Sequence, residues 1–372
     1  APQSRAMKET ELKFQIPAEQ LAGVRQALTS PQDARLGPVE TLQLHAAYFD
    51  TAAHALARRR CALRVRREND DWVQTFKGAG ADATTRLEEN CPVPPPTGGR
   101  LQPDLSVHSP EVQAALAQAL NGHPDQDAQG RQPLHALYET RFERLQALHQ
   151  GPRGQVLICL DQGDLMAGTL QSPLAELEFE LADGDAQALI DLARSWIEPH
   201  GLWLDVQSKA MKGTRLARAQ ASGQDTVTEA ILLKEVWPEA SVPAPGSEAW
   251  SPQAVRRGLS ACLDAAAGNW AEVAQARPGW PDALVAWLQA MEALSQGASA
   301  SSAVRASLPE NFWAQHAQLQ QAVQQALSQV QATTSTQANA QPSEPATHAA
   351  QDLARAPQTS AWALDLLSAL QA

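Results

Sequence analysis

The sequence has no long hydrophobic run and no excess of positive charge. No stretch approaches the roughly 18 consecutive apolar residues that a membrane helix needs, so we expect no membrane partner. The leading "APQSRA" has neither an apolar centre nor a cleavage-like end, which is not typical of a secretory signal. Lys and Arg number 29 against 41 Asp and Glu, a net charge of −12. Because nucleic-acid binding needs a surplus of cations on one face, this balance argues against a nucleic-acid partner.

Cysteine is also scarce, and its spacing excludes the common uses of paired cysteines. The four cysteines lie far apart and form no C-x-x-C motif: Cys61, Cys91, Cys159 and Cys262. Such spacing favours reduced thiols over a disulfide framework or a zinc site. The sequence therefore predicts a cytoplasmic protein.

A change in composition divides the 372 residues, which are enough for two domains that each bury a core. Residues 1–220 are mainly short alternating segments broken by turns, with a few helical stretches. Residues 221–250 are rich in Pro, Ser and Ala and indicate a linker. Residues 251–372 are Ala- and Gln-rich with helical periodicity. We predict an α+β chain, in which an antiparallel sheet with covering helices is followed by an all-α domain.

Charged residues recur at every second position along several predicted strands. Side chains of a strand alternate between faces, so "ALRVRR" puts Arg64 and Arg66 on one face, and "AELEFEL" does the same for its three glutamates. One such strand is typical of a half-exposed sheet with its polar side in water. Across five or six strands, the pattern favours apolar faces covered by helices and charged faces that line a closed or nearly closed barrel.

The carboxylates expected inside such a barrel need cations. Two carboxylates about 5 Å apart repel by roughly 3 kcal/mol at an effective dielectric of about 20. A cluster of Glu9, Glu11, Glu176 and Glu178 therefore indicates bound Mg²⁺ or Mn²⁺, which prefer oxygen ligands. The arginines and lysines match phosphate oxygens. The pattern predicts a site for a polyanionic chain with divalent cations.

An ordered series of motifs resembles the CYTH superfamily, the triphosphate tunnel metalloenzymes. The series starts with E-x-E-x-K at Glu9, Glu11 and Lys13 and continues through "YFDT", "LRVR", "TFK", "RLE", "TRFER", "LDQG", "ELEFEL" and "SKAMKG". E-x-E-x-K alone is a weak pattern, but the ordered series, over roughly residues 6–216, is specific. The resemblance implies an eight-stranded antiparallel β tunnel that binds a triphosphate and cleaves it with a divalent metal.

The resemblance also implies roles for individual residues. The phosphate-binding set is Lys13, Arg64, Arg66, Lys77, Arg86, Arg144, Lys209 and Lys212. The metal-binding set, with Mg²⁺ or Mn²⁺ as cofactor, is Glu9, Glu11, Glu88, Asp161, Glu176 and Glu178. The catalytic residues are expected to be Glu176, Glu178 and Lys13. Catalysis would rest on positioning and charge neutralisation during in-line attack of water on the terminal phosphorus.

Five neighbouring residues have plainer expected roles. Tyr48 and Trp72 are expected to pack, and Arg141 has the parity of the outer face. Arg67 and Glu180 are placed at strand ends, where solvation is expected. The histidines show no ligand spacing and receive no role.

Hydrolysis of inorganic triphosphate or a short polyphosphate is the leading function, because a CYTH domain followed by helices resembles bacterial inorganic triphosphatases. A nucleoside or thiamine triphosphatase has the same chemistry. An adenylyl cyclase would need a nucleobase site, and none can be identified. A noncatalytic polyphosphate-binding module would be indicated by loss of the metal carboxylates, which are present.

The helical part stands where such proteins carry a CHAD domain, but its composition differs. From Thr226 onward, six Lys and Arg stand against twelve Asp and Glu, and the only histidines are His316 and His348. A polyanion site there is not expected on charge. We interpret residues 251–372 as a shortened, diverged CHAD-like domain, for which packing against the first domain, homodimerisation and docking of a partner stay open.

Overall fold

The computed structural model describes residues 7–30, 32–82, 85–96, 101–120, 133–224, 228, 230–232, 252–334 and 341–371. These divide into two compact units. The sheet unit comprises Ala1–Glu11, Val24–Gly184 and Gln207–Thr226, and the helical unit comprises Leu12–Gly23, Asp185–Val206 and Val227–Ala372. The linker predicted over residues 221–250 lies largely outside the described residues, and its boundaries stay predictions.

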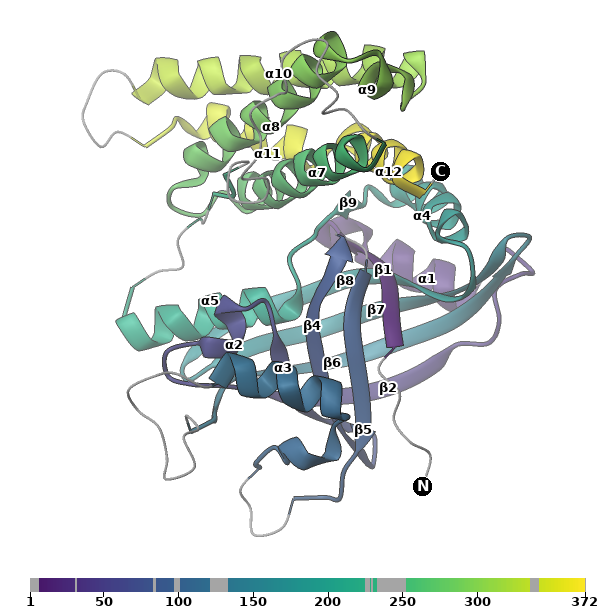
Figure 1. The fold of residues 1–372 in the computed structure, drawn as a ribbon, viewed down its shortest axis with the longest axis vertical. Helices are drawn as coiled ribbons and strands as arrows, with labels where there is room; N and C mark the ends of the chain where they lie inside the picture. Colours follow the sequence, from purple (N-terminus) through teal and green to yellow (C-terminus); the bar gives the residue numbers. More distant parts are fainter. Residues whose placement is uncertain are drawn as a thin grey trace. The chain divides into compact units, whose positions relative to one another are not determined.

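Nine strands form one antiparallel sheet (Figure 1). Their bounds are β1 (Met7–Gln15), β2 (Glu40–Asp50), β3 (Ala62–Glu68), β4 (Asp71–Asp82), β5 (Thr85–Pro92), β6 (His135–Gly151), β7 (Gly154–Ala167), β8 (Leu170–Gly184) and β9 (Trp203–Leu204). The order is β5–β4–β3–β2–β6–β7–β8–β1–β9, and β5 pairs in addition with β1.

The sequence and the family resemblance predict a closed or nearly closed barrel of eight strands, and the structure has an antiparallel sheet of nine. Strand β1 pairs over Met7–Thr10 with β5 and over Phe14–Gln15 with β9, so the sheet curves back through β1 but continues beyond it. The strand beyond the eight that the family resemblance implies is β9, which has two residues.

The register of three long strands aligns the charged residues of the sheet. Arg144 on β6 faces Asp161 on β7, and Asp161 faces Glu176 on β8. Two residues beyond Asp161, a Cβ on Gly163 would lie 2.1 Å from the carbonyl oxygen of Arg141. Glycine at this position therefore allows β6 and β7 to stay close beside the aligned charges.

Helices α2 and α3 cover the outer face of the sheet, as the sequence predicts, whereas α5 packs on the inner face. The sheet unit contains α2 (Ala55–Arg58), α3 (Pro110–Leu120), α5 (Lys209–Ser222) and η2 (Leu105–Val107), while η1 (Ala18–Gln20) and α1 (Leu21–Thr29) follow β1. Leu63 and Phe76 of the sheet share a buried core with Val112 and Leu116 of α3. Burying this apolar face leaves the opposite, charged face of the strands to the interior.

The helical unit has an aromatic core. Its helices are α4 (Ala186–His200), α7 (Pro252–Gln275), α8 (Trp280–Ala300), α9 (Ser302–Ala306), α10 (Glu310–Thr334), α11 (Glu344–Arg355) and α12 (Pro357–Gln371). The ring of Trp270 lies 5.9 Å from that of Trp287 and 6.2 Å from that of Trp362. These buried tryptophans join α7, α8 and α12, so they act as core anchors. Among the described residues, no helix combines the length and the apolarity required to cross a bilayer.

Candidate active site

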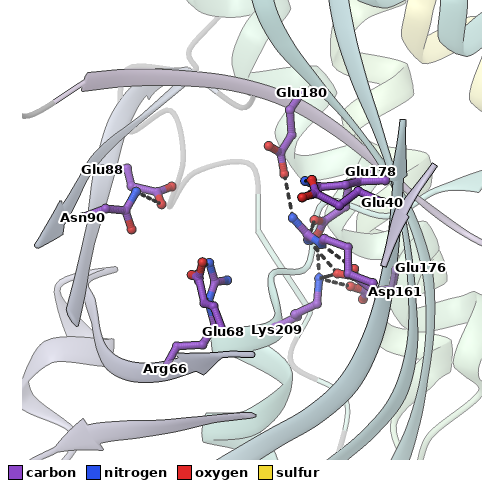
Figure 2. A network of polar contacts seen from close by, with 12 residues as sticks. Glu40, Arg66, Glu68, Glu88, Asn90, Asp161, Glu176, Glu178, Glu180 and Lys209 are labelled. Atoms are coloured by element: carbon purple, nitrogen blue, oxygen red, sulfur yellow. Dashed lines mark hydrogen bonds and ion pairs between the residues drawn. The ribbon is translucent and has the colours of Figure 1, made fainter. Parts of the chain in front are cut away.

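Polar side chains of β4 and β5 form one wall of the inner face of the sheet. The ammonium of Lys77 lies 2.6 Å from Glu88 Oε2, and Asn90 Nδ2 donates to Glu88 Oε1 at 2.9 Å. Asn90 in turn accepts from the hydroxyl of Thr75 at 2.7 Å. The alternation read from the sequence therefore places these side chains correctly on one face. Figure 2 shows Glu88 and Asn90 facing a second, more acidic wall.

The second wall is built around Arg144. Its guanidinium contacts Asp161 through Nε at 2.6 Å and through Nη2 at 2.8 Å, a bidentate arrangement. The same group reaches Glu178 at 2.5 Å and Glu180 at 3.3 Å. One largely buried cation thus holds three carboxylates from β7 and β8. Figure 2 shows these carboxylates, Asp161, Glu178 and Glu180, on this wall.

Helix α5 adds two ammonium groups to this wall. Lys209 Nζ lies 2.7 Å from Asp161, 2.9 Å from Glu176 and 2.6 Å from Glu178. Lys212 Nζ lies 2.6 Å from the other oxygen of Glu176. Removing a charge from water costs several kcal/mol, so carboxylates buried to this degree require close cations. The cations assigned to phosphate thus neutralise the carboxylates assigned to metal.

These contacts stabilise the charged forms of Glu178, Lys209 and Arg144. Burial raises the pKa of Glu178, but Lys209 and Arg144 outweigh burial and lower that pKa to about 2. Burial lowers the pKa of Lys209, yet Asp161, Glu176 and Glu178 raise it well above its usual value. The pKa of Arg144 is raised in the same way, against burial, by Asp161 and Glu178. Glu178, Lys209 and Arg144 therefore carry full charges near neutral pH.

Three carboxylates, which we call the inner carboxylate cluster, come together from two strands. Glu11 on β1 and Glu178 and Glu180 on β8 offer oxygens that all lie within 4.8 Å of one another. Burial raises the pKa of Glu180, and Glu178 and Glu11 raise it further against the effect of Arg144. Mutual repulsion of this kind is relieved by a divalent cation, and oxygen-only ligands suit Mg²⁺ or Mn²⁺. The residues present therefore fit a hard metal ion.

The position of Glu180 corrects an expectation. The sequence analysis assigned it to solvent at a strand end, but β8 continues to Gly184. Its side chain is 24% exposed and contacts Arg144. It lies with Glu178 on the inner face because both have the same parity along the strand.

Two further arginines lie on β3, and each contacts one side chain. Arg64 Nη1 donates to the hydroxyl of Tyr48 at 3.3 Å, and Arg66 Nε donates to Glu68 at 2.7 Å. Burial lowers the pKa of Arg66, and the neighbouring guanidinium of Arg64 lowers it further. Two guanidinium groups held together in this way favour an anion between them.

Three predicted site residues need separate mention. Lys13 is buried in the helical unit, where its Nζ lies 3.8 Å from Asp205 Oδ2. Glu9 pairs with Arg86 through the backbone of β1 and β5. The side chains of Glu9 and Arg86 lie outside what the structure describes, so their roles stay predictions.

The sequence analysis missed a second group of ligand-type side chains, which we call the Glu–Cys–His cluster. Glu89, Cys91 and His108 are buried, and their ligand atoms lie within 4.8 Å of one another. His108 Nδ1 contacts Glu89 Oε2 at 2.8 Å, and the backbone amide of Ser109 donates to the same oxygen at 2.9 Å. Cys91 Sγ donates to the carbonyl of Val107 at 3.4 Å.

A neighbouring amide determines where the proton of His108 resides. Gln74 exchanges two hydrogen bonds with the backbone of Asp104, at 2.8 and 2.9 Å, which fixes its amide nitrogen 3.0 Å from His108 Nε2. Nε2 therefore accepts, and Nδ1 carries the hydrogen that points at Glu89. A metal at Nδ1 would require the opposite tautomer. The Glu–Cys–His cluster is therefore a structural network that joins β4 and β5 to residues 104–109.

The remaining expectations agree with the structure, with Tyr48 on the inner face and Trp72 and Arg141 on the outer face. Tyr48 is buried, Trp72 packs against the outer core, and Arg141 is exposed. Arg67 is half exposed and pairs with Asp70. A pocket of about 560 Å³ on this face is lined by His45, Ala47, Phe49, Trp72, Leu101, Gln102, Leu134, His135, Ala136 and Glu139. It contains none of the predicted site residues.

An antiparallel sheet whose inner face pairs carboxylates with guanidinium and ammonium groups defines a class of protein suited to metal ions and polyanions. A family model for the CYTH domain matches residues 7–213, more than half of the chain. The chain belongs to the CYTH family.

Individual relatives are more distant. The inorganic triphosphatase of Haemophilus influenzae is 25% identical over 181 residues, which are 49% of this chain and 48% of that protein. The chain thus spans about half the length of this curated relative. Among solved structures, protein bh2851 of Bacillus halodurans is 18% identical, covering 55% of this chain and 97% of that one, with a TM-score of 0.37.

A second solved structure is HpAC1 of Hippeastrum, described with a dominant triphosphatase activity. It is 19% identical and covers 58% of this chain and 97% of its own, with a TM-score of 0.35. At these TM-scores the two structural likenesses do not bear on function.

Proposed function

We propose that this protein hydrolyses the terminal phosphate of inorganic triphosphate with Mg²⁺ or Mn²⁺. One observation carries the proposal: the inner carboxylate cluster lies on the same sheet face as buried guanidinium and ammonium groups. Oxygen ligands suit the metal, and the cations suit a chain of phosphates. Membership of the CYTH family and the distant inorganic triphosphatase relative support the same chemistry.

The proposed roles divide between carboxylates and cations. Glu11, Glu178 and Glu180 would hold the metal, which supplies charge neutralisation at the phosphate oxygens. Asp161 and Glu176 would hold Lys209 and Arg144 in place in the absence of substrate. When the substrate arrives, they would release these cations to its phosphate oxygens. Of the predicted metal-binding set, Glu9 and Glu88 would also contribute to the metal, whereas Asp161 and Glu176 would serve here as partners of the cations.

The remaining cations of the predicted phosphate-binding set are Lys13, Arg64, Arg66, Lys77, Arg86 and Lys212. Those of them whose side chains the structure describes in the sheet unit come from β3, β4 and α5. Held on rigid elements, they would fix the chain of phosphates for in-line attack by water, oriented by Glu176 and Glu178. Lys13 is proposed to assist in catalysis, as the family resemblance implies.

Phosphate release from tripolyphosphate, ATP and thiamine triphosphate, measured in parallel, tests the proposal. Each substrate is assayed with Mg²⁺, with Mn²⁺ and with chelator, and the ATP reaction is checked for cyclic AMP. We expect fastest release from tripolyphosphate and complete loss of release in chelator. Turnover of ATP or thiamine triphosphate but not of tripolyphosphate would change the proposed substrate and leave the proposed phosphate hydrolysis unchanged.

Two other outcomes would overturn the proposal. Cyclic AMP as the main product would make the protein a cyclase, and binding of tripolyphosphate with no turnover would make it a noncatalytic module. The cytoplasmic location, a homodimer and a diverged CHAD-like origin of residues 251–372 are separate predictions that these assays do not address.

A further inference from the structure

Helix α5 presents both of its site lysines from one face. Lys209, Lys212, Gly213 and Leu216 follow one another at helical spacing, so their positions lie on the same side of the helix. Lys209, Gly213 and Leu216 are buried. The depth at which this face sits against the sheet therefore sets how far the two ammonium groups reach toward the carboxylates.

Tyr138 on β6 contacts this face at its closest point. A Cβ on Gly213 would lie 2.1 Å from Cε2 and 2.2 Å from Cδ2 of the Tyr138 ring, closer than real Cβ atoms come. The hydroxyl of Tyr138 donates to the carbonyl oxygen of Ala210 at 3.1 Å. Tyr138 thus holds the helical turn that carries Lys209 and Lys212 both by its ring and by its hydroxyl.

The ring of Tyr138 is itself fixed. It stacks on Tyr48 with centroids 4.7 Å apart and an interplanar angle of 17°. Tyr48 accepts a hydrogen bond from Arg64, and Phe142, on the same strand as Tyr138, lies 5.4 Å from Lys209 Nζ. Three aromatic rings therefore form a platform beneath the cations of the site.

A second attachment holds the far end of α5. Gln220 Oε1 accepts from both the backbone amide and the hydroxyl of Thr169, each at 3.1 Å. This attachment lies about two helical turns beyond Gly213, near the C-terminal end of the helix.

The glycine needs a reason, because glycine inside a helix is about 1 kcal/mol less favourable than alanine. Close approach to the Tyr138 ring supplies that reason. We propose that Tyr138 is a positioning residue: through Gly213 and Ala210 it sets the depth of α5, so that Lys209 and Lys212 meet the substrate phosphates. The inference rests on the proposed triphosphatase function.

The first test is Gly213→Ala, which pushes the helix away from the ring. We expect KM for tripolyphosphate with Mn²⁺ to rise about tenfold or more, and tripolyphosphate binding in chelator to weaken similarly, because a displacement near 1 Å is costly in such sites. The matched control is Gly23→Ala in α1, where an added Cβ meets nothing within 4 Å. This control should leave KM within about twofold.

A double-variant cycle separates the contact from general damage. Tyr138→Ala removes the platform and should also raise KM about tenfold, whereas Tyr138→Phe keeps the ring and should stay within about threefold of the parent protein. In the Tyr138→Ala background, adding Gly213→Ala should change KM by less than about threefold, because the clash is gone.

Each other result has a definite meaning. Unchanged KM in both Gly213→Ala and Tyr138→Ala would overturn the inference and leave the proposed function intact. Fully multiplicative effects in the double variant would overturn it as well. If Gly213→Ala does not fold, the KM values of Tyr138→Ala and Tyr138→Phe are compared instead, and equal values would overturn the inference. A parent protein that neither binds nor hydrolyses tripolyphosphate would overturn the proposed function first.

Discussion

The inner carboxylate cluster and the Glu–Cys–His cluster lie on opposite faces of the same sheet. Each brings three ligand-type side chains within 4.8 Å, and each contains buried residues. The difference lies in the neighbours. Around His108, the amide of Gln74 and the backbone of residues 104–109 are fixed donors and acceptors. Around Glu178, the partners are the long side chains of Arg144 and Lys209.

Neighbours anchored in the backbone hold a ligand atom in one set of hydrogen bonds, whereas long charged side chains leave a ligand atom able to change partners. The proton of His108 is held in place by hydrogen bonds whose other ends are anchored in the backbone. The carboxylates of Glu178 and Glu180 are instead neutralised by cations that a phosphate can attract away. Nearness of ligand atoms alone therefore does not identify a metal site.

The largest expected effect comes from breaking the inner carboxylate cluster. Glu11→Gln keeps the size of the side chain but removes a charged ligand, so metal-dependent turnover should fall about 1,000-fold or more. The thermal midpoint should stay close to that of the parent protein. Glu139→Gln, on the outer face beside His45, is the matched control and should turn over normally. Retained activity of Glu11→Gln with Mg²⁺ or Mn²⁺ would remove this residue from the metal site.

The reverse experiment breaks the Glu–Cys–His cluster. Glu89→Ala leaves His108 and the Ser109 amide without their buried acceptor, so the free energy of unfolding should fall by about 3 kcal/mol. Turnover per folded molecule should not change. Urea unfolding and a tripolyphosphate assay on the same sample measure both quantities. Loss of turnover with unchanged stability would make this cluster functional and contradict the comparison.

His316 in the helical unit is a third buried polar group, and hydrogen-bond partners hold it in place as they do His108. Its Nδ1 accepts from Trp362 Nε1 at 3.1 Å, and Ser295 lies 2.9 Å from its Nε2. Burial lowers its pKa from the usual 6.5 to about 4. A proton on Nδ1 would face another donor, the indole N–H.

The sign of the resulting pH dependence follows from linkage. Between pH 6.5 and 4 the unfolded chain binds the proton and the folded unit does not, so stability falls as pH falls. The total loss should be about 3 kcal/mol by pH 4, beside contributions from other groups. His316→Phe keeps a stacked ring, and its urea-unfolding midpoint should change less with pH over this range than that of the parent protein. An equally steep dependence in the variant would exclude His316 as its source.

The sequence predicted the faces of the sheet well because a strand has a fixed period of two. Lys77, Glu88 and Asn90 share a face in the structure, as do Glu178 and Glu180. It placed Glu180 wrongly, because alternation does not locate the end of a strand when charged residues continue almost to that end.

Contacts between distant segments were beyond the sequence. His108 meets Glu89 and Cys91 only because residues 104–109 return to the outer face of β4 and β5. The pairing of Lys209 with three carboxylates depends on how deeply α5 sits, which local periodicity does not record.

The metal ion should bind at the inner carboxylate cluster and not at the Glu–Cys–His cluster. Crystals grown with Mn²⁺ and tripolyphosphate, measured at a wavelength where manganese scatters anomalously, locate the ion without assuming a mechanism. We predict an anomalous peak bounded by Glu11, Glu178 and Glu180, with Arg144 and Lys209 turned toward phosphate. A peak at Glu89, Cys91 and His108, or phosphate bound with no manganese near the inner carboxylates, would contradict the account.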